Sequence, residues 1–89
     1  MTSFLFRIWA GPANVADFGR IFQNAGLRVV IHGTEHIYVL RDSHVGAAEA
    51  GDAVQSMLNR TGLAFRPDVV LWATLSDDAA EQLRSHKPW

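Results

Sequence analysis

The sequence predicts one small α+β domain, a ferredoxin-like βαββαβ split sandwich with a short extra helix at its end. Three observations support this fold class. The 89 residues make a single domain, residues 1–89, and leave no room for a second. Apolar residues follow strand and helix spacing in the order strand, helix, strand, strand, helix, strand. The connections are short, and right-handed crossovers then give a four-stranded antiparallel sheet of order 4-1-3-2, with both main helices on one face.

The first strand and helix are marked by their residue types and by glycine. Residues 4–10 are aromatic and β-branched, which is typical of a strand, and Gly11-Pro12 ends the run. Asn14 can cap the helix that follows. That helix carries apolar residues at helical spacing: Val15, Phe18, Phe22 and Ala25. Gly26 is a natural stop, because glycine readily adopts the left-handed conformation that ends many helices.

A β-hairpin is predicted next, with strands at residues 27–32 and 35–41. Gly33-Thr34 would form the two-residue connection, and glycine in the first place suits a type II′ turn. Such a turn fixes the register of the two strands, so that residue 32 faces 35 and residue 30 faces 37.

The second half of the chain is predicted to contain a long helix, a fourth strand and a short helix. Asp42 or Ser43 can cap the long helix. Its inner stripe is apolar or small: Ala47, Ala50, Val54, Met57 and Leu58. A turn at residues 66–68 precedes the fourth strand at residues 69–75. Ser76 then caps the last helix, which has few apolar residues.

The hairpin register predicts which side chains leave the helices and face outward. It places His36, Tyr38 and Leu40 toward the helices, and on the fourth strand the inward set is Val69, Leu71, Ala73 and Leu75. The other face of the sheet is then apolar at its centre, with Leu5, Trp9, Val30, Ile37, Val39, Val70 and Trp72. It is charged at its rim, with Arg7, Arg28, His32, Glu35 and Arg41.

An apolar centre on an open sheet face predicts an interaction surface, since a face exposed to water is normally polar. The expected binding residues combine Trp and Arg with aliphatic side chains: Arg7, Trp9, Val30, Ile37, Val39, Arg41 and Trp72. We therefore expect a non-catalytic binding or regulatory module that forms a homodimer or binds a protein partner. Two alternatives stay open: the last helix covers this face, or the register is wrong by one residue.

The alternative function is a small-molecule-binding dimer or an enzyme. In the predicted register His36 and Tyr38 point between sheet and helices, where His36 could act as a general base and Tyr38 as a donor. Such an arrangement resembles cofactor-free enzymes of the dimeric ferredoxin-like barrel type. Separately, the first strand, the Gly11-Pro12 loop and the segment Gly26-Leu27-Arg28-Val29 resemble the start of an ACT regulatory domain, a family that binds amino acids at dimer interfaces near that loop. The order Gly11-Pro12 is reversed from the usual pattern, and we do not assign the chain to that family.

Composition argues against several other function classes. The net charge of −1 offers no general attraction to nucleic acid or to an anionic membrane. Cysteine is absent from the sequence, and His32 and His36 flank a turn rather than sharing a helix face, so we expect no metal site and no cofactor. Asp42-Ser43-His44 are adjacent and cannot form a catalytic relay. The apolar start is interrupted by Arg7 and is too short for a signal sequence, so we expect a cytoplasmic protein.

Overall fold

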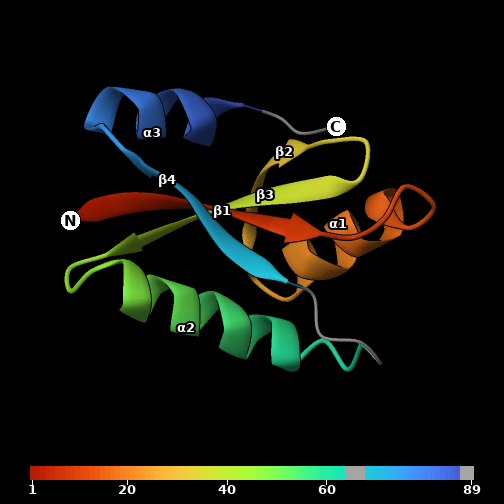
Figure 1. The fold of residues 1–89 in the computed structure, drawn as a ribbon. Coiled ribbons are helices and arrows are strands. Elements are labelled where there is room, and N and C mark those ends of the chain that lie inside the picture. The colour runs from red at the N-terminus through yellow and green to blue at the C-terminus, as the bar shows by residue number, and fades with distance from the viewer. Residues whose placement is uncertain (64–67, 87–89) are drawn as a thin grey trace.

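Strands and helices alternate along the chain in the computed structural model, which describes residues 1–63 and 68–86 (Figure 1). In chain order the elements are β1 (Thr2–Trp9), α1 (Val15–Asn24), β2 (Arg28–His32), β3 (His36–Ser43), α2 (Ala47–Asn59), β4 (Val69–Leu75) and α3 (Asp77–Ser85). The fold is therefore α+β, with four strands and three helices in the described residues, as the sequence predicted. The turn expected at residues 66–68 falls largely outside them.

All strand pairs in the sheet are antiparallel, and the strand order is β2-β3-β1-β4. Listed from the β4 edge, the same neighbours give 4-1-3-2. The two central strands are β1 and β3, and β2 and β4 are the edges.

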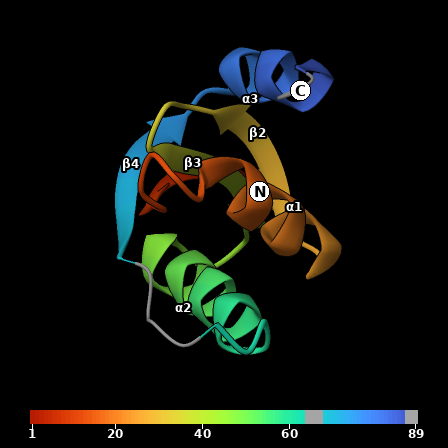
Figure 2. The same cartoon turned by 90° about the vertical axis from the view of Figure 1, so that its right-hand side faces the viewer.

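The sheet separates two apolar layers. Helices α1 and α2 pack on one face, and the main core lies between them and the sheet. That core includes Phe4, Phe6, Ile8, Phe22, Val29, Ile37, Val39 and Val54. Helix α3 packs on the opposite face, which we call the open face, and in both views α2 and α3 lie on opposite sides of the sheet (Figures 1 and 2). Strand β1 alternates as predicted, because Phe4, Phe6 and Ile8 point to the helices.

The hairpin between β2 and β3 differs from the prediction in its turn and in its register. The Gly33 N–H donates to the His36 carbonyl oxygen at 2.9 Å, so Thr34 and Glu35, not Gly33 and Thr34, form the tip. The register then shifts between Val29 and Ile31, where Val30 is an extra residue in β2. A one-residue bulge exchanges the two faces of a strand relative to its partner.

As a result, the predicted faces of β3 are reversed. Ile37 and Val39 pair with Ile8 and Phe6 and lie in the main core, fully buried. Tyr38 and Leu40, which were expected to face α1 and α2, lie on the open face instead, with Leu40 buried and Tyr38 partly buried.

A second bulge reverses part of β4. Leu5 pairs with Ala73 but Phe6 pairs with Leu71, which leaves Trp72 as the extra residue. Ala73 and Leu75 therefore pack on the α3 side rather than inward as predicted. Leu71 keeps the predicted side, opposite Phe6, yet it is 45% exposed because β4 is an edge strand.

Two predicted helix caps have different outcomes. The Ser76 hydroxyl accepts a hydrogen bond from the Ala79 N–H at 3.2 Å, which confirms the predicted cap of α3. Neither Asp42 nor Ser43 is the N-cap of α2, since both belong to β3 and Gly46 takes that position. The Ser43 hydroxyl instead accepts from the N–H groups of Val45 and Gly46 and stabilises the turn into the helix.

Candidate functional site

Helix α3 covers one half of the open face. Its Leu83 packs on the buried cluster of Leu5, Val30 and Leu40. Val30 is only 1% exposed as a result, and it cannot be a contact residue as the sequence predicted. The alternative in which the last helix covers the face is therefore correct for this half.

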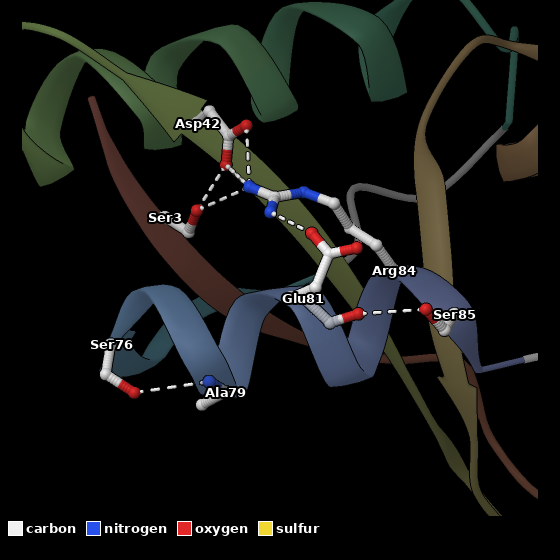
Figure 3. Close-up of polar contacts among 7 residues, drawn as sticks. All are labelled: Ser3, Asp42, Ser76, Ala79, Glu81, Arg84 and Ser85. Atoms are coloured by element: carbon white, nitrogen blue, oxygen red, sulfur yellow. Dashed lines mark hydrogen bonds and ion pairs between the residues drawn. The ribbon is translucent and has the colours of Figure 1, made fainter.

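A polar cluster at the end of α3 fixes the helix to the two central strands (Figure 3). Arg84 donates from Nη2 to both carboxylate oxygens of Asp42, at 3.1 and 3.2 Å, and to the Ser3 hydroxyl at 3.0 Å. Ser3 and Asp42 are paired residues of β1 and β3, and the Ser3 hydroxyl donates to Asp42. On the helix itself, Arg84 Nη1 also donates to Glu81 at 3.4 Å.

The pKa of the Asp42 carboxyl is lowered from its ordinary value of 3.8. The hydrogen bond from Ser3 lowers it most, partial burial opposes that effect, and the positive charge of Arg84 lowers it further. Asp42 is thus held as a carboxylate that binds Arg84 and Ser3. Its role is structural, because these contacts attach α3 to the sheet.

The other half of the open face is not covered by α3, and we call it the aromatic face. It consists of Arg7, Trp9, His36, Tyr38, Val70 and Trp72. The Arg7 guanidinium carbon lies 4.2 Å from the centroid of the Trp72 ring, a cation–π contact. Tyr38 meets Trp72 edge to face, with ring centroids 6.1 Å apart. Trp72 and Trp9 are still 51% and 49% exposed.

A small cavity lies at the end of the aromatic face, lined by Arg7, Trp9, His36, Asp68 and Val70. Its volume of about 210 Å³ is below the roughly 300 Å³ at which small-molecule sites begin. Tyr38 is not among the described lining residues, and His36 Nδ1 lies 3.9 Å from the Glu35 carboxylate. The structure therefore does not place His36 and Tyr38 in the shared inner pocket that the enzyme alternative predicted.

Strand β4 is an exposed edge without charged residues. Its sequence is VVLWATL, and three consecutive large side chains, Val70, Leu71 and Trp72, are 42%, 45% and 51% exposed. The other edge, β2, begins with Arg28, ends with His32, and contains the bulge at Val30. Charges and bulges normally protect a free edge from pairing with another chain. Both edges carry a bulge, but charged or ionisable side chains occur only on β2.

The remaining predicted contact residues divide into two groups. Arg7, Trp9 and Trp72 lie on the open face as expected, and their binding role stays a prediction. Ile37 and Val39 are 0% exposed in the main core, so their predicted place on the surface is wrong. Arg41 pairs with Phe4 on the helical side of the sheet, with Nη1 3.9 Å from Met57 Sδ. The bulge at Val30 explains all three differences on β3, because it inverts that strand relative to β2.

Comparison with known proteins adds no family assignment. The chain matches no protein-family model, no curated protein and no solved structure. Within residues 1–63 and 68–86, no three or more His, Asp or Glu side chains are grouped so that they could hold a metal ion. No helix in this same part of the chain has the length and apolar character to span a membrane.

Proposed function

We propose that this chain is a non-catalytic binding module that pairs with a second copy of itself through the β4 edge, including the exposed side chains of Val70, Leu71 and Trp72. The observation that carries the proposal is the exposure of Val70, Leu71 and Trp72 on a strand with unpaired backbone groups and no charge. Two β4 strands running antiparallel would satisfy these backbone groups and form a two-fold symmetric dimer.

Edge pairing is favoured over the face-to-face contact that the sequence alone suggested. Helix α3 stands on the open face of the sheet (Figure 2), so two sheets cannot meet flatly across that face. Trp72 belongs to the same face, because its ring meets that of Tyr38. Leu71 is exposed on the opposite side of β4, and a face-to-face contact would leave it in water. Pairing along β4 covers Leu71 on one side together with Val70 and Trp72 on the other.

We further infer that the fold is the ferredoxin-like split βαβ sandwich. The support is the strand order β2-β3-β1-β4, with α1 and α2 together on one face. This fold hosts many unrelated functions, so it adds nothing to the choice of function. The enzyme alternative has less support, because the cavity beside His36 is small and does not include Tyr38.

Sedimentation velocity on three variants tests the proposed pairing. Wild type should sediment as a dimer with twice the mass of one chain across the micromolar range. Leu71→Lys should weaken the dimer by at least about tenfold, because a charge is buried at the edge. The matched control is Val45→Lys, which adds the same charge at a side chain 83% exposed outside the sheet, and it should dimerise normally.

The variant Trp9→Ser separates edge pairing from face-to-face pairing. Trp9 lies on the aromatic face but on the central strand β1, away from the β4 edge. Edge pairing predicts little change for Trp9→Ser and a large one for Leu71→Lys. The reverse result would assign the contact to the face, and a wild type that stays monomeric at submillimolar concentration would reject self-pairing altogether.

A further inference from the structure

A cavity of about 400 Å³ lies across the sheet from the β4 edge, and it is lined by residues at the start of β2 and the end of β3 together with Met57 of α2 and Arg84 of α3. Its described lining includes three arginines, Arg28, Arg41 and Arg84, and one acidic residue, Asp42. This volume lies within the range of small-molecule sites. The cavity is separate from the aromatic face, and the proposed dimer makes no use of it.

Two of the three guanidinium groups are not bound to a carboxylate in the described part of the chain, although the charge of Arg28 acts on Asp42 from a distance. Arg84 is paired with Asp42, which leaves that carboxylate occupied by Arg84 and Ser3. Neither Arg28 nor Arg41 forms an ion pair with a described residue. Arg41 Nε is buried and has no hydrogen-bond partner among the described residues, and Nη1 has only the weak contact with Met57 Sδ.

An unpartnered buried guanidinium nitrogen is costly, since burial removes its hydration without replacing it. An anion in the cavity would offset part of this cost through its charge, because the positive charge is shared by the whole guanidinium group although Nε itself is buried. Arginine presents several N–H donors in a rigid plane, which suits the oxygens of a phosphoryl group or a carboxylate. The excess of two positive charges fits a dianion better than a monoanion.

We propose that this cavity binds the dianionic group of a small ligand, with Arg28 and Arg41 as its direct partners. Arg84 acts as a positioning residue, because its Nη2 is already held by Asp42 and Ser3. The apolar part of the wall, which includes Leu27, Leu40 and Met57, would contact the uncharged part of the ligand. A phosphate monoester and a dicarboxylate share this chemistry.

Inorganic phosphate, sulfate and succinate are the probes, with sodium chloride at equal ionic strength as the reference. Chemical shifts of the Gly26 and Leu27 amides, which line the cavity, report binding by NMR titration. Saturable shifts with phosphate and sulfate alone would assign a phosphoryl group, and shifts with succinate alone would assign a dicarboxylate. Shifts that follow chloride equally would overturn the proposal.

Substitutions test whether Arg28 and Arg41 are the residues that bind the anion. Arg28→Gln and Arg41→Gln should each weaken binding about tenfold or more. Arg28 is exposed, so its replacement leaves the fold intact and keeps the test decisive even where Arg41→Gln impairs folding. The control Arg20→Gln removes an exposed arginine on α1 that does not line the cavity, and it should bind as wild type does. Equal loss in Arg20→Gln and Arg28→Gln would mean nonspecific charge attraction and would reject the site.

Discussion

Arg84 is the side chain through which the last helix is attached to the centre of the sheet. Its partners Ser3 and Asp42 lie on the central strands β1 and β3, and both contacts are partly buried. Helix α3 offers few apolar residues, so a charge-assisted contact of this kind has a large share in holding it. No local pattern reveals this contact, because Arg84 and Asp42 are separated by 42 residues. The sequence suggested Asp42 only as a helix cap.

Stability should depend on pH through Asp42. Its pKa is lowered in the folded chain, so folding favours the carboxylate. The contribution is fully present above the unfolded pKa of about 3.9 and is lost as pH falls through the lower folded value. We expect Asp42→Asn to reduce the free energy of unfolding by about 1 kcal/mol at pH 7, a modest figure because the pair is a third exposed.

Urea unfolding of both proteins at pH 7 and at pH 3 measures this effect. The difference between wild type and Asp42→Asn should shrink at pH 3, because this pH lies below the unfolded pKa and the unfolded wild-type chain takes up a proton on Asp42. Asp52→Asn, an exposed position on α2, is the control and should show no such difference. An undiminished gap at pH 3 would contradict the assignment to Asp42 ionisation.

At the scale of elements, the strands were easier to predict than their faces. The positions of β1, β2, β3 and β4 follow from composition and turns, and the inward residues of β1 are correct. The faces of β3 and the end of β4 are wrong because each depends on a one-residue bulge. Val29-Val30-Ile31 are all β-branched and apolar, so either face of β2 satisfies alternation and the bulge leaves no sequence signal.

Helix α3 should contribute to stability through one apolar contact in particular. Leu83→Ala removes the half-buried side chain that packs on Leu5, Val30 and Leu40. We expect a loss of about 1–2 kcal/mol, below the roughly 2–5 kcal/mol for a fully buried leucine, because the site is only partly buried. Gln82→Ala, at the exposed neighbouring position, should change stability by less than about 0.5 kcal/mol. Chemical unfolding of the two variants compares them, and equal losses would mean that α3 does not cover the cluster.

For the whole molecule, the way the helices cover the sheet decides which apolar surface remains exposed and available for binding. Helices α1 and α2 bury one face, and α3 buries half of the other, so the apolar surface that remains is the aromatic face and the β4 edge. The sequence predicted the excess of apolar surface and placed Arg7, Trp9 and Trp72 within it. The sequence did not predict that β4 would be the most exposed strand. The alternation along β4 places Leu71 on the inward side, and so it was expected to be buried. A chain of 89 residues has a small core, and association through this surface would add to its stability.

Because association of two chains would add to stability, the thermal midpoint of unfolding should depend on protein concentration. A dimer that unfolds to two separate chains is stabilised by mass action, and a hundredfold excess over the dissociation constant adds about 2.7 kcal/mol. For a chain of this length that corresponds to a rise of roughly 11–22 °C, at 4–8 °C per kcal/mol within a two-state domain. Calorimetry from micromolar to submillimolar wild type should show this rise. Leu71→Lys should have a midpoint that depends much less on its concentration, and Val45→Lys should follow wild type. A wild-type midpoint that is constant over the same range, with Trp72 fluorescence typical of an exposed indole, would show that β4 remains a free edge.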